Sequence, residues 1–369
     1  MLPTFNKALY KGKRVAVGLS GGVDSSVSAY LLKEAGCQVK GFYMKNWQDN
    51  DALCNQNFDQ KDAEYIANQL DIDFEVVNFE KAYHQEVFQE MLKQYKLGWV
   101  PNPDIWCNKF IKFEHFFNHI KKLNFDYLAT GHYASIGIND NDEAELLSAV
   151  DTHKDQTYFL CSIKKAYLEK LIFPLGHIEK KQVRAIAHDQ NLVVADKKDS
   201  TGICFVGPAA IKPFLESYII AAQGNVISET GVVLGKHDGV IFYTLGQRQG
   251  LNIGGVKGAD QKPWFVVEKR LESNELVISQ HPQQEKYRVT SVICQSFNYL
   301  SYLNQSNLKC KTRHGGKLLS VQIQCIDDNH FEISFNEPVY KLSPGQWCVL
   351  YNDLICLGGG QISKINYAE

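Results

Sequence analysis

The chain has 369 residues, of which 44% are apolar, and its formal net charge is −2 at pH 7. This length exceeds the usual size of one hydrophobic core, because domains commonly hold about 100–200 residues, so we expect two or three domains. The near-neutral charge argues against a protein that coats nucleic acid non-specifically, and the lack of a long apolar run or a leader pattern predicts a cytoplasmic protein without a membrane partner.

The first predicted element is a strand, loop and helix unit near the N-terminus. An apolar run at residues 14–18 leads into the sequence GLSGGVDSS at 18–26, and helical periodicity follows at 27–34. Such a loop directs backbone N–H groups and a helix N-terminus at one small volume, which favours the phosphates of a nucleotide. It lacks the lysine of the common P-loop, and an ordinary turn in which Asp24 or Ser25 caps the helix is the alternative.

Short β-rich runs then alternate with amphipathic helical patterns up to about residue 206. Strands are expected at 14–18, 38–43, 74–78 and 127–130, and helices at 27–34, 59–70 and 109–123. This alternation predicts an α/β domain over residues 1–207, with a parallel sheet and helices on both faces. Ligands of such sheets bind at the carboxyl ends of the strands, so the glycine-rich loop and Gly131 should converge there.

Beyond about residue 208 the pattern changes to shorter β-like runs. A small β-rich central domain is expected over residues 208–284, with strands at 232–234, 240–243 and 264–268 and a loop-rich insert from residue 244. Further runs at 287–295, 308–313, 320–326, 331–335 and 347–351 predict a small C-terminal β-barrel over residues 285–369.

Two of the ten cysteines stand in contexts that favour a reactive thiol. Cys107 lies in a proline-broken loop that leads into a lysine-bearing helix, and Cys204 follows two lysines. A helix N-terminus and a nearby lysine lower the pKa of a thiol, although a buried structural cysteine explains each residue equally well. The cysteines show no Cys-x-x-Cys spacing, so we expect no structural metal.

Seven motifs in order give the chain a resemblance to a known family. They are GLSGGVDSS at 18–26, MKNW at 44–47, NPD at 102–104 before CNK at 107–109, ATGHY at 129–133, KDQTY at 154–158, STGICF at 200–205 and GQR at 246–248. Over essentially its whole length the chain resembles the tRNA-specific 2-thiouridylase family of the ATP-pyrophosphatase superfamily. The resemblance implies that ATP adenylates the C2 oxygen of a wobble uridine (U34) and that sulfur then replaces this oxygen, with release of AMP and pyrophosphate.

The resemblance also implies which residues act on ATP and sulfur. Met44 and Gly131 would border the adenosine. The loop would hold the ATP phosphates, with Mg²⁺, through Gly18, Leu19, Ser20, Gly21, Gly22, Val23, Asp24 and Ser25. Cys204 would carry a persulfide from a sulfur-relay donor protein, with Cys107 as its catalytic partner. In one scheme the persulfide on Cys204 attacks C2, and Cys107 then captures the bridging sulfur, which leaves a Cys107–Cys204 disulfide. In the other, Cys107 first frees hydrosulfide, and the hydrosulfide attacks C2. Asp104 would assist proton transfer, or it would cap the following helix.

The implied substrate is the anticodon stem-loop of tRNAs for Lys, Glu and Gln, and the central domain and the C-terminal barrel would both contact the tRNA. The residues expected to contact it are Asn102, Pro103, Asp104, His132, Lys154, Asp155, Gln156, Arg313, His314 and Gln346. A structural role is the alternative for His132. The family often has a tyrosine where this chain has His314, so a stacking role does not follow there. The oligomeric state stays open, a monomer included.

Two other classes of protein remain as alternatives. An amide-forming synthetase would use the same loop to adenylate a carboxylate, but it would not need the two cysteines, and a 4-thiouridine synthetase-like enzyme also shares the loop. An RNA-binding or redox-sensing protein would use Cys107 and Cys204 only as a regulatory disulfide, and the complete phosphate loop argues against it.

Overall fold

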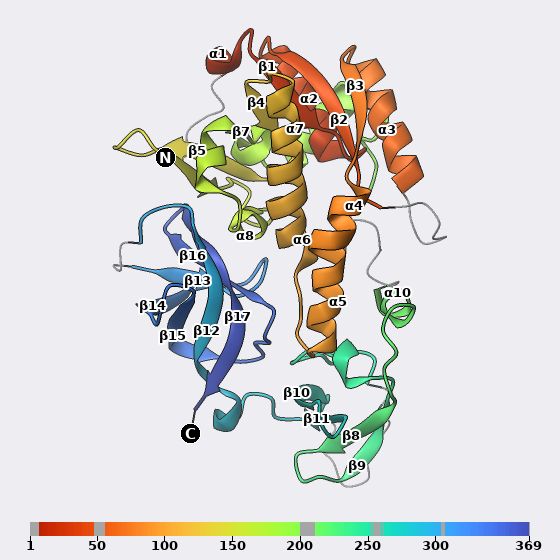
Figure 1. The fold of residues 1–369 in the computed structure, drawn as a ribbon, viewed down its shortest axis with the longest axis vertical. Coiled ribbons are helices and arrows are strands. Elements are labelled where there is room, and N and C mark those ends of the chain that lie inside the picture. Colours follow the sequence, from red (N-terminus) through yellow and green to blue (C-terminus); the bar gives the residue numbers. More distant parts are fainter. Residues whose placement is uncertain are drawn as a thin grey trace.

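The fold comes from a computed structural model that describes residues 7–47, 56–199, 211–251, 253, 260, 262–303 and 307–368. Figure 1 shows an α/β part at the top, a β-barrel at the lower left and a smaller central part at the bottom. Of two long helical runs, one descends from the α/β part to the central part and the other ends near the middle of the molecule. Among the described residues, no helix is long and apolar enough to cross a membrane.

The α/β part is built on a five-stranded sheet in the order β3-β2-β1-β4-β7. All neighbouring strands run parallel, which confirms the predicted sheet. Their bounds are β1 (Arg14–Gly18), β2 (Gln38–Lys45), β3 (Asp73–Asn78), β4 (Tyr127–Ala129) and β7 (Leu171–Ile172). The chain order reverses on either side of β1, so a crevice opens at the carboxyl ends of β1 and β4, where ligands of such sheets bind.

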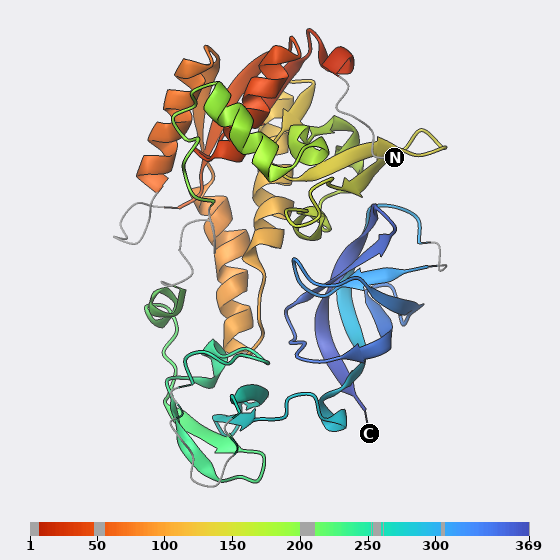
Figure 2. The same cartoon turned by 180° about the vertical axis from the view of Figure 1, so that it is seen from behind.

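Helices cover both faces of this sheet. Alternate residues of β1 point to opposite faces: Val15 and Val17 belong to one apolar cluster and Ala16 to another. The first cluster includes Val27 from α2 (Val23–Glu34), and this face also carries α3 (Gln56–Gln69) and α9 (Lys180–Asp189). Figure 2 shows these helices from behind. The second cluster includes Phe116 from α7 (Phe116–Lys122).

Two helical runs are longer than their apolar periodicity suggests. The first comprises α4 (Glu80–Tyr83), the π-helical η1 (His84–Phe88) and α5 (Gln89–Lys96), and the second comprises α6 (Pro103–Trp106), the π-helical η2 (Cys107–His115) and α7. The predicted helix at 109–123 therefore begins six residues earlier, because Pro103 occupies its first turn, where no N–H is needed. The short helices are α1 (Lys7–Tyr10), α8 (Thr157–Leu160), η3 (Lys165–Lys170) and η4 (Pro174–His177).

The central part contains a four-stranded sheet in the order β10-β11-β8-β9. Its elements are α10 (Ile211–Glu216), β8 (Gly224–Ser228), β9 (Val233–His237), η6 (Val240–Phe242), β10 (Phe265–Arg270) and β11 (Glu275–Ser279). The strand predicted at 240–243 is wrong, because these residues form the 3₁₀ turn η6. Val240 and Tyr243 lie one turn apart and are both buried in the core of this part, so one helical turn buries them together.

The C-terminal part is a closed six-stranded barrel in the order β12-β15-β14-β13-β16-β17, and β12 also pairs with β17. After η7 (Glu285–Tyr287) come β12 (Val289–Tyr299), β13 (Lys309–Lys311), β14 (Leu319–Cys325), β15 (His330–Val339), β16 (Trp347–Asn352) and β17 (Ile355–Tyr367). The barrel is confirmed, but β17 was not predicted. Three consecutive glycines hide its pattern, and a Cβ on Gly359 would lie 2.7 Å from the carbonyl oxygen of Cys348.

A hairpin of the α/β part extends the barrel sheet. It consists of β5 (Ala134–Ile138) and β6 (Ala144–Ser148), and Leu147 pairs with Ile355 of β17. The α/β part and the barrel therefore share one sheet across their boundary.

Candidate functional site

The glycine-rich loop is held in shape by its own hydroxyl groups and by one left-handed residue. The hydroxyl of Ser25 accepts a hydrogen bond from the backbone N–H of Ser20 and donates one to the carbonyl of Gly22, each at 3.1 Å. Gly21 has φ +71°, and a Cβ there would lie 2.1 Å from the carbonyl oxygen of Asp59. Only glycine fits this position, so the turn between β1 and α2 is fixed in this conformation.

The loop meets Gly131, as the sequence predicts. A Cβ on Gly131 would lie 2.6 Å from the backbone nitrogen of Ser25, so the backbone after β4 packs directly on the first turn of α2. A Cβ on Gly18 would lie 3.2 Å from Cε of Met44, which stands near the end of β2. The residues expected to border a nucleotide therefore come together at the carboxyl ends of β1, β2 and β4.

Asp24 does not cap α2 but forms the centre of a polar network. Gly22 is the N-cap residue and no side chain caps the helix, so the capping alternative for Asp24 and Ser25 is wrong. The hydroxyl of Tyr133 donates to Asp24 at 2.8 Å, and the ammonium of Lys180 donates to both carboxylate oxygens at 2.7 and 2.8 Å. Burial and the Asp24 carboxylate raise the pKa of Tyr133, which keeps its hydroxyl a donor.

A second carboxylate, Asp199, forms ion pairs with three cations beside this network. Lys154, Lys180 and Arg184 approach it at 2.7, 2.8 and 2.9 Å. Lys197 lies nearby, because it donates to the carbonyl of Gly21 at 2.8 Å. Of these four cations, only Lys154 belongs to a motif that indicated a role. The one available signal was the spacing of Lys180 and Arg184, which puts both on one face of α9.

Asp199 is expected to make stability depend on acid pH. Burial alone would raise the pKa of Asp199, but hydrogen bonds and charge from Lys154 and Lys180 lower it from 3.8 to about 2. Because the folded-state pKa is lowered, the stabilisation is complete above about pH 4 and is lost as the pH falls from about 4 to 2. Chemical unfolding should show Asp199→Asn less stable than wild type by up to about 2 kcal/mol at pH 6. The difference should shrink at pH 3, and an equal difference at both pH values would contradict the assignment.

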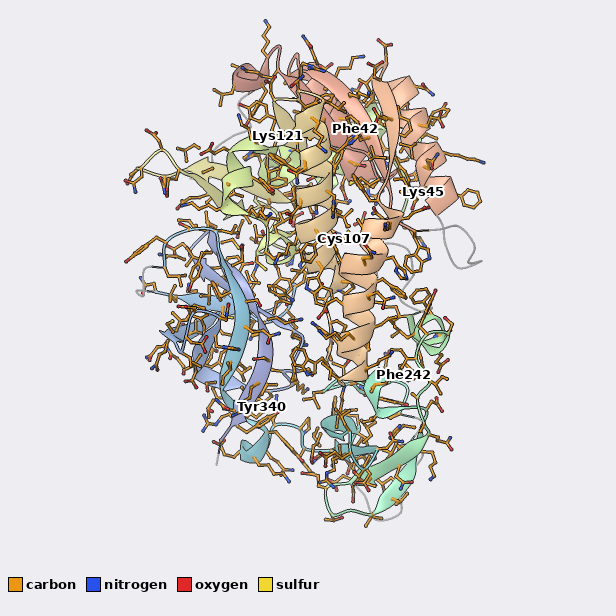
Figure 3. All side chains as sticks on the ribbon, viewed as in Figure 1. Phe42, Lys45, Cys107, Lys121, Phe242 and Tyr340 are labelled. Carbon is orange, nitrogen blue, oxygen red and sulfur yellow. The ribbon has the colours of Figure 1, made fainter. Side chains whose placement is uncertain are left out.

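Cys107 lies inside a helix and not at its N-terminus. Asn102 is the N-cap residue, and Cys107 follows α6 directly as the first residue of η2. The argument from a nearby helix N-terminus is therefore wrong for this thiol. Its side chain is 1% exposed and packs in the main apolar core, and Figure 3 places it in the middle of the molecule. Cys204, the other predicted sulfur carrier, lies outside the described residues.

Asp104 lies in the first turn of α6. It is therefore not the N-cap of the helix that contains Cys107, and the capping alternative is wrong for this residue too. A carboxylate in a first turn is favoured by the helix dipole. Asn102 and Pro103 begin the same helix, so these three predicted contact residues precede Cys107 by three to five positions in one helical run.

His132 is enclosed by aromatic rings. It is 8% exposed, and its Nδ1 lies 2.7 Å from the hydroxyl of Thr130. The rings of Phe113 and Phe173 lie 5.8 and 6.0 Å from its own. Burial, and then the charge of Lys112, lower the pKa of His132 well below its usual range, so the ring is neutral. This environment matches the structural alternative.

The other predicted tRNA contacts divide into buried and exposed residues. Asp155 is buried, and the side-chain oxygen of Gln156 accepts the backbone N–H of Tyr133 at 2.9 Å. Arg313 and His314 are exposed. Gln346 is half-buried, and its side-chain oxygen accepts the backbone N–H of Ser343 at 2.9 Å.

Three family models match the chain one after another. They are described as tRNA methyl transferase HUP domain (residues 13–208), tRNA methyl transferase PRC-barrel domain (212–280) and Aminomethyltransferase beta-barrel domain (289–362).

Curated relatives named tRNA-specific 2-thiouridylase MnmA match almost the whole chain. The relative from Buchnera aphidicola subsp. Acyrthosiphon pisum is 46% identical over 360 residues, which are 96% of this chain and 98% of the relative. The relative from Lysinibacillus sphaericus is 46% identical over 357 residues, 95% of this chain and 94% of the relative. Among solved structures, the U34-tRNA thiolase NcsA from Methanococcus maripaludis is 19% identical with a TM-score of 0.38, covering 58% of this chain and 68% of its own.

Proposed function

Because the chain belongs to the tRNA-specific 2-thiouridylase family, we propose that it replaces the C2 oxygen of wobble uridine in tRNA by sulfur in an ATP-dependent reaction. The observation that supports this function most directly is the meeting of the glycine loop, Gly131 and the cations around Asp199 at one edge of the parallel sheet. Asp199 stands five residues before Cys204, the proposed sulfur carrier, in the sequence.

The loop residues fit a nucleotide. The turn presents backbone N–H groups at the start of α2, where the helix dipole favours phosphate, and the missing Cβ of Gly131 leaves room for the loop to keep this shape. In our proposal the residues from Gly18 to Ser25 hold the phosphates, and Met44 and Gly131 border the adenosine. Mg²⁺ would come with the nucleotide and would neutralise the charge of the leaving pyrophosphate.

Activation of the base is the chemical reason for ATP. The C2 oxygen of uridine belongs to a urea-like carbonyl and would leave only as a strongly basic anion. ATP supplies an adenylyl group to this oxygen with release of pyrophosphate, and AMP is then a good leaving group for attack by sulfur. Lys180 and Lys154 stand beside the loop, so their charges favour the negative charge that pyrophosphate carries away.

The two cysteines supply the replacement atom. Cys204 takes a persulfide from a sulfur-relay donor, and Cys107 acts with it in the transfer to C2. Since Cys107 is buried, the extruded uridine reaches its sulfur only if neighbouring side chains move. Asp104, three residues before Cys107 in the same helical run, would handle the proton.

The tRNA is expected to lie across the α/β part and the barrel. Around Cys107, Asn102 and Pro103 would cradle the flipped base, and Lys154 would contact the anticodon loop. On the barrel, Arg313, His314 and Gln346 would contact the backbone. We propose the tRNAs for Lys, Glu and Gln as substrates.

A direct assay tests this function. Purified protein is incubated with ATP, Mg²⁺, a persulfide donor and an unmodified transcript of a tRNA for Lys, Glu or Gln, beside a matched transcript with cytidine at position 34. We expect 2-thiouridine and AMP with the first transcript and neither with the second. Consumption of ATP that does not depend on tRNA would contradict the proposal and favour an amide-forming synthetase.

Binding of the tRNA is expected to weaken as salt rises. Each phosphate contact contributes about 0.7–0.9 to the slope of log affinity against log salt. Arg313→Ala should therefore lower this slope by about one, because Arg313 is exposed and makes no ion pair within the described part of the chain. Filter binding at several salt concentrations measures the slope, and Lys13→Ala, exposed just before β1 at the sheet edge opposite the glycine loop, serves as a surface-charge control. An unchanged slope for Arg313→Ala would remove this residue from the interface.

A further inference from the structure

The KDQTY motif contains a buried ion pair that joins the α/β part to the barrel. Oδ2 of Asp155 lies 3.0 Å from Nζ of Lys311, and the two side chains are 2% and 14% exposed. Lys311 is the last residue of β13, two positions before Arg313. A charge pair at this depth occupies a place in the protein interior and not on a surface open to RNA.

The carboxylate of Asp155 is satisfied entirely by protein groups. The backbone N–H of Ala149 donates to Oδ1 at 3.1 Å, and the hydroxyl of Thr157 lies 3.0 and 2.8 Å from the two oxygens. That hydroxyl is also 3.1 Å from the hydroxyl of Tyr351, and the ammonium of Lys311 stands 4.9 Å from the centre of the Tyr351 ring. Removing one partner of such a pair would leave an uncompensated charge in the interior.

Tyr158 and Phe159, which follow Asp155 in the sequence, contact the barrel residues that follow Lys311. The hydroxyl of Tyr158 donates to the carbonyl of Thr312 at 3.3 Å, and the ring of Phe159 packs against the ring of His314 with centres 4.6 Å apart. The residues at 155, 158 and 159 therefore hold those at 311, 312 and 314. Arg313 lies between these anchored positions with its side chain exposed.

The same motif is tied to the phosphate edge at its other end. Lys154 binds Asp199 at 2.7 Å. Gln156 makes two hydrogen bonds with the backbone of Tyr133, both at 2.9 Å, and the hydroxyl of Tyr133 binds Asp24 of the glycine loop. Residues 154–159 thus connect the glycine loop with the 311–314 segment through direct contacts.

We propose that Asp155 is a positioning residue, which through Lys311 fixes the 311–314 segment so that Arg313 and His314 face the tRNA in register with the glycine loop. Asp155 and Lys311 do not touch the tRNA themselves. The proposal deepens the proposed function and rests on it for its RNA readouts, whereas its structural part is measurable without RNA.

A double-mutant cycle tests the proposal on the full chain. The variants are Asp155→Asn, Lys311→Met and the two combined, with Glu145→Gln as the matched control. Glu145 accepts a hydrogen bond from Ser301 at 2.9 Å, so it also joins the α/β part to the barrel but does not hold the 311–314 segment. The measurements are thermal unfolding, hydrogen exchange of residues 309–316, and tRNA affinity at several salt concentrations.

We expect each single variant to lower the unfolding midpoint by several degrees. The midpoint of the double variant should be no lower than that of the less stable single variant, because the double variant leaves no unpaired charge in the interior. Exchange at 309–316 should quicken in all three. The tRNA affinity should fall about tenfold, and the salt slope should fall by up to about one to the same extent in Asp155→Asn and Lys311→Met, because Arg313 loses its phosphate contact in both. Glu145→Gln should keep wild-type exchange and affinity.

Three results would overturn the proposal. Additive losses of midpoint or unchanged exchange at 309–316 would show that the pair does not fix the segment. A salt slope lowered by about one in Lys311→Met but unchanged in Asp155→Asn would show that Lys311 contacts phosphate directly. If wild type itself binds no tRNA, the proposed function fails, whereas the unfolding and exchange measurements still decide whether the pair holds the segment.

Discussion

Replacement of Cys107 by serine is expected to reduce thiolation with a persulfide donor by at least about 1000-fold, the scale on which removal of a covalent catalytic group acts. The hydroxyl is close in size to the thiol but is a far weaker nucleophile and forms no disulfide or persulfide. Mass spectrometry of the digested tRNA measures 2-thiouridine. AMP formation, followed in the same reaction, shows whether activation of the base survives without sulfur transfer.

A second buried cysteine provides the control. Cys161 lies in the same apolar core and is fully buried, and burial raises the pKa of its thiol well above its usual range. Cys161→Ser carries the same change of a buried thiol to a hydroxyl, so it should lose stability to a similar degree and keep its activity per folded molecule. Normal thiolation by Cys107→Ser would remove this cysteine from the mechanism.

Replacement of Gly131 by alanine is expected to lower kcat/KM for ATP by at least about 100-fold. The new Cβ would lie 2.6 Å from the backbone nitrogen of Ser25, so either the segment after β4 or the first turn of α2 must move. A displacement of about 1 Å in a positioning group can cost 100-fold in rate. Thiolation at varied ATP concentrations measures the effect, and thermal unfolding measures the accompanying loss of stability.

Gly12→Ala separates a displaced loop from general destabilisation. Gly12 has φ +76° and open space around its Cβ position, so alanine there costs roughly 1 kcal/mol of backbone strain. It precedes β1 and therefore lies at the sheet edge opposite the glycine loop. Its use of ATP should match wild type. If Gly131→Ala and Gly12→Ala behaved alike, the close contact with Ser25 would have no role in ATP use.

The strands and helices of the α/β part were predictable because each carries its own pattern. In β1, Val15 and Val17 are buried on one face and Ala16 on the other, which is the continuous apolar run typical of a parallel strand. Elements defined by their partners were missed or misassigned. The glycines at 358–360 give β17 no apolar pattern, and Val240 looks extended in sequence but belongs to a 3₁₀ turn.

The residues of the candidate site likewise divide into those that a local sequence pattern indicated and those that it did not. The motif order indicated the glycine loop, Gly131 and Cys107, because each is a local arrangement of residue types. No local pattern indicated that Lys180 joins Asp24 to Asp199, since these residues are far apart in the chain and meet only in the folded protein. The position of Cys107 relative to its helix was also missed, because Pro103 starts the helix before the apolar periodicity begins.

The sequence by itself determined the family, the parallel sheet, the barrel and the position of the glycine-rich loop, because glycine positions and apolar periodicities act over a few neighbouring residues. Only the tertiary structure decided which polar residues of the motifs face inward. Asp155 looks like a surface contact in sequence, yet it is buried against Lys311, 156 positions away. The physical reason is that the charge of a carboxylate is visible in the sequence, whereas the partner that compensates its burial is brought to it by the packing of the barrel against the α/β part.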